Sequence, residues 1–165
     1  MDTIILIGMP NTGKTSVGKI LAHDMKKRFI DTDEIITKTT KLTPRQIVLT
    51  EGEKVFLKMQ QDILINMDMK DVVLATGGSV VYSEKLMLHL KERGYIIYLY
   101  TQLDELSDRM TKERRIVGSD SKSFEEIYQE RDNLYRKYAH KEINCGGQSI
   151  QKIVEKIKLE VQNNG

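Results

Sequence analysis

Short apolar runs alternate with longer amphipathic segments along this chain, and the alternation predicts strands separated by helices. Continuous runs of β-branched and other apolar residues are typical of strands buried on both faces of a parallel sheet. Such runs predict five strands, at residues 4–7, 28–30, 72–75, 95–99 and 142–143. Apolar residues at three- and four-residue spacing predict the helices. These are expected at residues 17–25, from 35, from 44, and at 53–66, 83–94, 102–110, 123–137 and from 149.

Two helix starts carry a capping box, in which a Ser or Thr and a Glu or Gln three residues later satisfy each other's backbone donors. The pairs are Thr43 with Gln46 and Ser123 with Glu126. Because a helix follows each predicted strand, we expect an α/β three-layer sandwich with a five-stranded parallel sheet. The whole chain, residues 1–165, is expected to form a single domain. Ligands of such sheets bind at the carboxyl ends of the strands.

The segment after the first strand matches the phosphate-binding pattern G-x-x-x-x-G-K-[ST] at Gly8, Gly13, Lys14 and Thr15. Its glycines let successive backbone N–H groups point inward, and the following helix adds its positive N-terminal end. Chance would produce these four residues in a chain of this length with a frequency on the order of one in a hundred or less. Asn11 stands where many such loops carry another glycine, but asparagine tolerates a left-handed backbone. We therefore expect a polyphosphate-binding loop.

Polar residues also follow the second and third predicted strands. Asp31 and Asp33 lie on the same side of the chain if that segment is extended, so one carboxylate would face a metal ion and the other a substrate hydroxyl. The alternative is that this Asp-Thr-Asp segment only caps the next helix. Gly77 and Gly78 follow the third strand, where they form either a simple turn or a place where backbone approaches the substrate.

Composition and charge narrow the function further. Charged residues make up 30% of the 165 residues, yet the net charge is only +2 and basic residues are interleaved with acidic ones, which argues against a nucleic-acid or membrane surface. The apolar run at residues 4–7 is too short for a signal-peptide core. Cys145 is the single cysteine, which favours a reducing compartment. We expect a cytoplasmic enzyme.

A polar segment at residues 111–122, containing Gly118, lies between two predicted helices. Its composition and position predict a mobile lid. Arg114 or Arg115 could swing from this lid onto the phosphates, although charges in a loop often serve solubility alone.

Taken together, these motifs resemble the shikimate kinase family, a branch of the nucleoside monophosphate kinase-like P-loop fold. The resemblance extends over nearly the whole chain. It rests on the phosphate-binding loop, Phe29 with Asp31 and Asp33, Gly52-Glu53 with Phe56, the segment from Ala75 to Gly78, Arg109, Glu130-Arg131, Leu134-Tyr135 and Ala139.

The resemblance implies an ATP- and magnesium-dependent kinase that phosphorylates a hydroxyl of a small metabolite, with shikimate, in aromatic amino acid biosynthesis, as the expected acceptor. It implies that Asp31 and Thr15 hold Mg²⁺, that Lys14, Asp33 and Arg115 are catalytic, and that Arg131 pairs with the substrate carboxylate. The implied ATP-binding residues are Gly8, Asn11, Thr12, Gly13, Lys14, Thr15, Ser16 and Arg109. The implied substrate-binding residues are Asp33, Gly77, Gly78, Ser79 and Arg131. We expect no nucleic-acid or membrane partner, and a monomer.

The chain departs from the family pattern around the acceptor. The family carries an arginine after Phe56 and a glutamate three residues further on, but this chain has Leu57 and Gln60. Ser79 replaces a glycine, and Arg115 is followed by isoleucine instead of proline.

Three hypotheses follow from these departures. In the first, a rearranged shikimate kinase uses Arg131 with Lys58 or a lid arginine. In the second, the acceptor is another hydroxylated acid, amino acid or sugar acid. In the third, the chain is a catalytically silent nucleotide-binding module. The retained Lys14, Thr15, Asp31 and Asp33 argue against the third, because nucleotide binding alone needs no acid at the acceptor.

Overall fold

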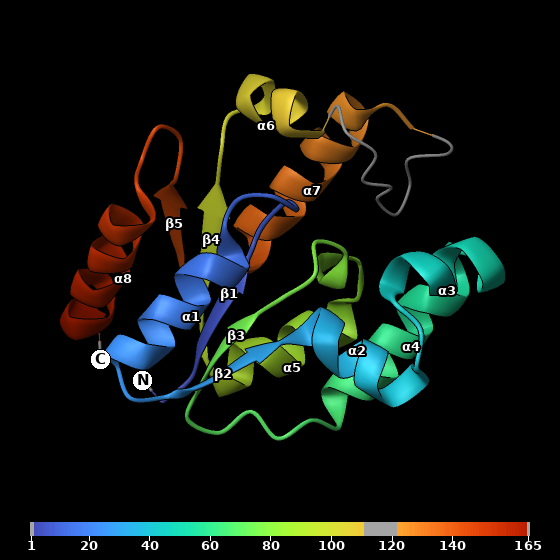
Figure 1. Ribbon diagram of the computed structural model, residues 1–165, viewed down its shortest axis with the longest axis horizontal. Coiled ribbons are helices and arrows are strands. Elements are labelled where there is room, and N and C mark those ends of the chain that lie inside the picture. Colours follow the sequence, from blue (N-terminus) through green and yellow to red (C-terminus); the bar gives the residue numbers. More distant parts are fainter. Residues whose placement is uncertain (1, 111–121, 165) are drawn as a thin grey trace.

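The computed structural model describes residues 2–110 and 122–164. Its centre is a five-stranded parallel sheet with the strand order β2-β3-β1-β4-β5 (Figure 1). The strands are β1 Ile4–Ile7, β2 Arg28–Asp31, β3 Val72–Ala75, β4 Tyr95–Tyr100 and β5 Lys141–Asn144. The predicted parallel sheet is therefore confirmed. Its central strands β1 and β3 are completely buried, as continuous apolar runs require.

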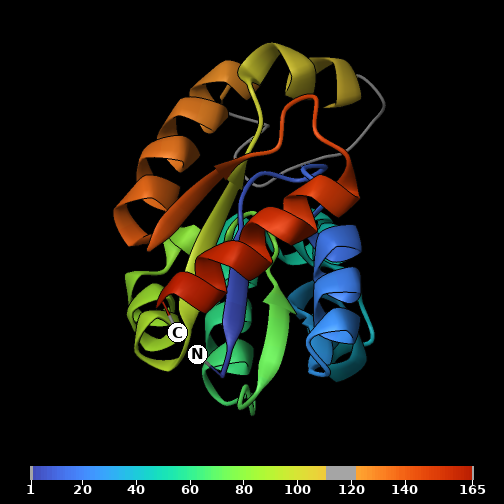
Figure 2. The ribbon, with the colours of Figure 1, turned by 90° about the vertical axis from the view of Figure 1, so that its left-hand side faces the viewer.

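Helices cover both faces of this sheet. They are α1 Lys14–Asp24, α2 Thr32–Thr40, α3 Pro44–Glu51, α4 Glu53–Ile65, α5 Glu84–Arg93, α6 Leu103–Met110, α7 Phe124–Tyr138 and α8 Ile150–Asn164, with a short 3₁₀ helix at Val80–Tyr82. On one face, α1 and α8 pack side by side over the sheet (Figure 2). On the other face, α4, α5 and α7 contribute to the larger core. None of the described helices is long and apolar enough to cross a membrane.

Helices α2, α3 and α4 enclose a separate small core beside the sheet. It contains Ile36, Ile47 and Phe56, all at most 2% exposed. In Figure 1 these three helices project from the edge of the sheet that β2 forms. They therefore place a wall of side chains next to the carboxyl ends of β2 and β3.

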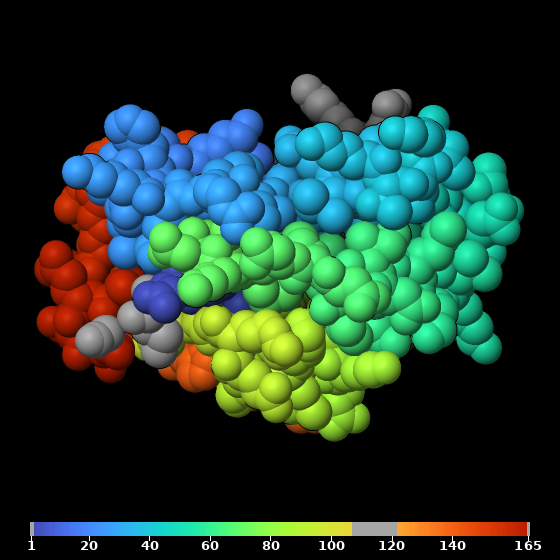
Figure 3. Space-filling view, turned by 90° about the horizontal axis from the view of Figure 1, so that it is seen from below, coloured from blue at the N-terminus to red at the C-terminus, as the bar shows by residue number. Residues whose placement is uncertain are grey.

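The amino-terminal ends of the strands, opposite the carboxyl ends, are covered by the connection from α4 to β3. Figure 3 shows this connection in green between α2 and α5. Lys27 pairs with Asp71 at 2.6 Å, and Arg28 donates to the Lys70 carbonyl at 3.2 Å. These contacts hold the connection against the end of the sheet that lies away from the phosphate-binding loop.

One local prediction was wrong. The segment after β2 is not extended, because α2 begins at Thr32, earlier than the residue 35 expected from the apolar pattern. Asp31 is the N-cap, and its Oδ1 accepts the backbone N–H of Asp33 at 2.9 Å. Asp31 thus caps the helix, while Asp33 lies in its first turn.

Candidate active site

The phosphate-binding loop joins β1 to α1 in a conformation that exposes backbone donors. Asn11 and Gly13 both have a positive φ, at 66° and 90°, so the predicted left-handed backbone at Asn11 is present. Gly13 is the N-cap of α1, and no side chain among the described residues caps the helix there. The first-turn N–H groups of α1 thus face the loop together with the positive end of the helix dipole, which favours a bound anion.

Lys14 lies inside this loop. Its side chain is largely buried, and Nζ donates to the carbonyl oxygens of Gly8 and Met9 at 2.7 and 2.6 Å. Thr12 is buried as well, and its hydroxyl donates to the Met9 carbonyl at 2.9 Å. Thr12 therefore stabilises the loop from within, whereas Lys14 brings a cation to the cavity that the loop encloses.

That cavity, here called the phosphate cavity, lies at the carboxyl ends of β1, β2 and β3. Its lining residues are Pro10, Asn11, Gly13, Lys14, Thr15, Ser16, Asp31, Asp33, Thr76, Gly77 and Gly78. The Thr15 hydroxyl donates to Asp31 Oδ2 at 3.0 Å. A hydroxyl and a carboxylate thus meet at one point of the wall, and oxygen donors of this kind suit Mg²⁺. The structure brings together the two residues predicted to hold the metal.

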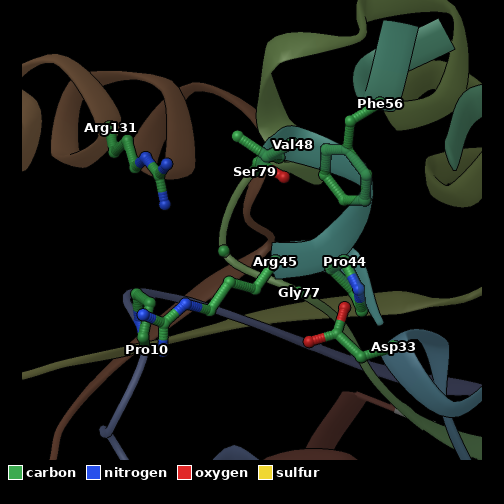
Figure 4. A pocket seen from close by; sticks show the side chains of 10 residues that line it. Pro10, Asp33, Pro44, Arg45, Val48, Phe56, Gly77, Ser79 and Arg131 are labelled. Atoms are coloured by element: carbon green, nitrogen blue, oxygen red, sulfur yellow. The ribbon is translucent and has the colours of Figure 1, made fainter. Parts of the chain in front are cut away.

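A second cavity, the adjacent pocket, opens beside the first (Figure 4). It is lined by Pro10, Asp33, Pro44, Arg45, Val48, Phe56, Gly77, Gly78, Ser79 and Arg131. Pro10, Asp33, Gly77 and Gly78 line both cavities. Because Asp33 lies where the two cavities meet, its carboxylate can contact a molecule in the adjacent pocket next to a phosphate group in the other.

Gly77 and Gly78 leave room for two charged side chains. A Cβ at residue 77 would lie 2.6 Å from Asp33 Oδ1, and a Cβ at residue 78 would lie 2.7 Å from Arg131 Nη1. The Gly77 N–H donates to the Thr32 hydroxyl at 2.9 Å, which ties this loop to the first turn of α2. The two glycines thus allow a carboxylate and a guanidinium to approach the same stretch of backbone.

Arg131 of α7 is only 1% exposed although it is an arginine. Its Nε donates to the Tyr82 hydroxyl at 3.3 Å, and its guanidinium lies over the Tyr82 ring at 5.2 Å. Burial raises the pKa of Tyr82, and the positive charge of Arg131 opposes that shift. Figure 4 shows Arg131 and Asp33 on opposite sides of the adjacent pocket, so a cation and an anion face its interior.

Tyr135 supports the glycine segment from behind. Its hydroxyl donates to the Gly78 carbonyl at 2.5 Å. Burial raises the pKa of Tyr135 to about 12, with the charge of Arg131 acting in the opposite direction. The phenol therefore stays protonated at neutral pH and remains a donor to this carbonyl.

Leu57 and Gln60, the two α4 residues that depart from the family pattern, lie in different surroundings. Leu57 packs against the small core of α2, α3 and α4 and is not part of the lining of the adjacent pocket. Gln60 is 1% exposed, and its Nε2 donates to the Ser79 hydroxyl at 3.3 Å. Lys58 points elsewhere, because its Nζ pairs with Asp62 at 3.1 Å on the exposed face of α4. The structure thus contradicts the hypothesis that Lys58 supplies the second cation.

Arg45 is the main residue that the sequence analysis missed. It lies in the first turn of α3 and lines the adjacent pocket. The sequence analysis had noted only the capping box, formed by Thr43 and Gln46, within which Arg45 lies. Pro10, Pro44, Val48 and Phe56 also line the pocket without having been predicted to do so. The side chain of Arg109 and residues 111–121 of the predicted lid, which include Arg114 and Arg115, lie outside the described residues.

Comparisons with known proteins agree on one family. A family model described as shikimate kinase matches residues 10–162. The shikimate kinase of Nitrosospira multiformis is 34% identical over 96% of this chain and 84% of the relative. That of Nitrosomonas europaea is 35% identical over 96% and 80%.

Solved structures give the same result. Shikimate kinase from Acinetobacter baumannii in complex with shikimate has a TM-score of 0.89 and 30% identity, covering 99% of this chain and 94% of that chain. Shikimate kinase from Aquifex aeolicus has a TM-score of 0.84 and 26% identity, covering 98% and 97%.

Proposed function

Because the chain belongs to the shikimate kinase family, we propose that it transfers the γ-phosphoryl group of ATP to a hydroxyl group of shikimate. The observation that carries this proposal is the pair of joined cavities with Asp33 at their junction. The triphosphate would occupy the phosphate cavity and the acceptor the adjacent pocket. An oxygen of the acceptor would then lie next to both the γ-phosphorus and the Asp33 carboxylate.

In this reaction the acceptor oxygen forms a bond to the γ-phosphorus while the bond between that phosphorus and the bridging oxygen of ADP breaks. Asp33 orients the hydroxyl and accepts its proton. Lys14 and the N–H groups of α1 stabilise the charge on the phosphate oxygens, because they are held in place before the substrate arrives. From the lid, Arg115 is proposed to add a further positive charge, and Arg109 to lie against the adenine.

Magnesium is the metal that we propose for this site. Thr15 and Asp31 would hold it, and their oxygen atoms converge at 3.0 Å. No cluster of three His, Cys, Asp or Glu side chains occurs within the described residues, which fits a magnesium ion that takes its other ligands from phosphate and water. When bound, the ion supplies positive charge to the phosphate groups.

We further propose that residues 1–165 act as a single domain, because all five strands belong to one sheet, and that the protein is a monomer. A cytoplasmic location is proposed from the need for ATP and from Cys145 being the single cysteine of the sequence, which favours a reducing compartment.

A second candidate is a kinase for another hydroxylated acid. It is favoured by the place of Leu57, which brings no cation from α4 to the adjacent pocket. Both candidates are tested by a coupled ADP-release assay with Mg²⁺ and ATP, in which shikimate is compared with other hydroxylated acids, amino acids and sugars. Saturable turnover with shikimate supports the proposed function. No turnover with shikimate, together with turnover of another acceptor, favours the second candidate.

A further inference from the structure

We propose that Arg45 of α3 binds the carboxylate of the acceptor together with Arg131. This inference rests on the proposed function and names how the adjacent pocket recognises its acid. Arg45 and Arg131 are the two cationic side chains among the described residues that line the pocket, and Asp33 is the one anionic side chain there. A hydroxylated acid fits this arrangement when its hydroxyl meets Asp33 and its carboxylate meets the arginines.

The position of Arg45 is fixed by the start of α3. Thr43 accepts the N–H of Gln46 at 3.2 Å, and the Gln46 side chain accepts the N–H of Thr43 at 2.8 Å. Pro44 occupies the first helical position, where its restricted φ suits the helix. The first turn, which carries Arg45, is therefore held rigidly although most of α3 is exposed.

The Arg45 side chain extends across the pocket in the direction of Pro10 (Figure 4). Pro10 also lies near Arg131, because a Cβ at Gly78 would be 3.0 Å from Pro10 Cδ and 2.7 Å from Arg131 Nη1. Arg45 thus reaches toward the part of the pocket that Arg131 lines. Two planar guanidinium groups approaching from α3 and α7 can share one carboxylate through charge-assisted hydrogen bonds.

Within the described part of the chain, no hydrogen bond or ion pair holds the Arg45 guanidinium. It is exposed, whereas Arg131 is buried against Tyr82. Arg131 would therefore be positioned in advance, and Arg45 would close on the carboxylate when the acid enters. One fixed and one movable arginine suit a pocket that must first admit its ligand.

The residues of α4 support the proposal that the cation for the acceptor carboxylate comes from α3. Leu57 contributes only apolar contact to the small core. Gln60 is uncharged and donates to Ser79, so no buried carboxylate in this region needs a cation from α4. A glutamate at residue 60 would be a buried anion beside Leu57 without such a partner, which is costly.

The experiment compares Arg45→Gln with Lys54→Gln, because Lys54 is an exposed cation of α4 outside the pocket and each variant removes one positive charge. Steady-state kinetics are measured with shikimate and with its methyl ester, which lacks the negative charge. Arg45→Gln is expected to raise KM for shikimate about 10- to 100-fold, the effect of losing a charge-assisted hydrogen bond. Its kcat should change little, and its KM for the ester should stay the same. Lys54→Gln should leave both acceptors unaffected.

Arg45→Lys, which keeps the charge but loses the planar fork, should give an intermediate KM for shikimate. An Arg45→Gln variant that keeps the wild-type KM for shikimate, or that raises KM equally for acid and ester, would overturn the role of Arg45 alone. A wild-type enzyme that phosphorylates other acceptors but not shikimate would overturn the proposed function as well, so the two failures are distinguishable.

Discussion

At the scale of single residues, Asp33 has the most specific of the proposed chemical roles. Asp33→Asn keeps the size of the side chain but removes its ability to accept a proton. We expect the rate of phosphoryl transfer to fall by about 10²- to 10⁴-fold, the usual contribution of general acid–base catalysis. The affinity for ATP, measured by fluorescence titration or calorimetry, should change little, because Lys14 and the N–H groups of α1 remain. An equally large loss of ATP affinity would mean that Asp33 acts on the nucleotide.

The glycine pair provides a second prediction. In Gly77→Ala the new Cβ would lie 2.6 Å from Asp33 Oδ1, so the carboxylate must move. A shift of about 1 Å in a catalytic group can lower the rate about 100-fold, and kcat should fall by that order. In Gly78→Ala the Cβ would instead press on Arg131 Nη1 and Pro10. That variant should raise the acceptor KM more than it lowers kcat.

Both variants are to be checked for folding by circular dichroism and thermal denaturation. If both changed kcat and KM in the same proportion, the assignment of Asp33 to chemistry and Arg131 to binding would not hold.

Where a motif is contiguous, the sequence predicts well which residues line the same cavity. Gly13, Lys14 and Thr15 follow one another, so their geometry is set by one turn and the start of one helix. Arg45 could not be found in this way, because its place in the pocket and its proposed role depend on how α3 lies against a loop that follows β1. Lys58 was misplaced although a local signal existed: Asp62 lies four residues later, at the spacing of helix ion pairs.

At the scale of elements, α3 depends on its capping box. Ile47 is its one buried residue, so packing contributes little to holding the helix. Thr43→Ala should lower the free energy of unfolding by about 1 kcal/mol, the usual effect of removing such a cap. The first turn, with Pro44 and Arg45, should also become less ordered, and the acceptor KM should rise.

Urea denaturation and steady-state kinetics measure these two effects. Thr43→Ser is the matched control, because it keeps the hydroxyl that accepts the N–H of Gln46. The control should retain both the stability and the KM of the wild type. An acceptor KM that stays the same in Thr43→Ala would show that the pocket does not need an ordered start of α3.

Elements with a strong apolar pattern or a capping box were predicted closely, whereas the start of α2 was not. The apolar runs of β1 and β3 gave these strands at residues 4–7 and 72–75 as the structure has them. The start of α2 was missed because Asp31 caps the helix and draws Thr32 and Asp33 into its first turn. The 3₁₀ helix at Val80–Tyr82 is a single turn, too short to show a period in the sequence.

At the scale of the whole molecule, the parallel topology explains why distant residues meet. Alternating strands and helices place all carboxyl ends at one edge, and this much follows from the sequence pattern. The strand order places β1 between β3 and β4, so the phosphate-binding loop neighbours the glycine pair after β3. The separation of α2, α3 and α4 into their own small core is a tertiary property that no local pattern encodes, and it forms one wall of the adjacent pocket.

The outer strand β5 offers a test of how pH affects the whole fold. His140, directly before β5, accepts the Ile96 N–H through Nδ1 at 2.9 Å and stacks on Tyr95 at 5.1 Å. Burial, assisted by the charge of Lys91, holds the pKa of His140 below its ordinary value of 6.5. His140 therefore binds a proton less readily in the folded chain than in the unfolded chain. This contribution to stability is complete above about pH 6.5 and is lost as the pH falls through the folded-state pKa.

His140→Asn isolates this contribution, because the Asn Oδ1 can accept the same N–H but does not titrate. Urea denaturation at pH 7.5 and at pH 5.0 should show that the wild type loses more free energy of unfolding than the variant. The carboxylates titrate in both proteins, so their effect cancels in the comparison. Equal losses would mean that His140 is protonated as readily in the folded chain as in the unfolded one. A smaller loss in the variant would instead identify the junction of β4 and β5 as an acid-sensitive part of the sheet.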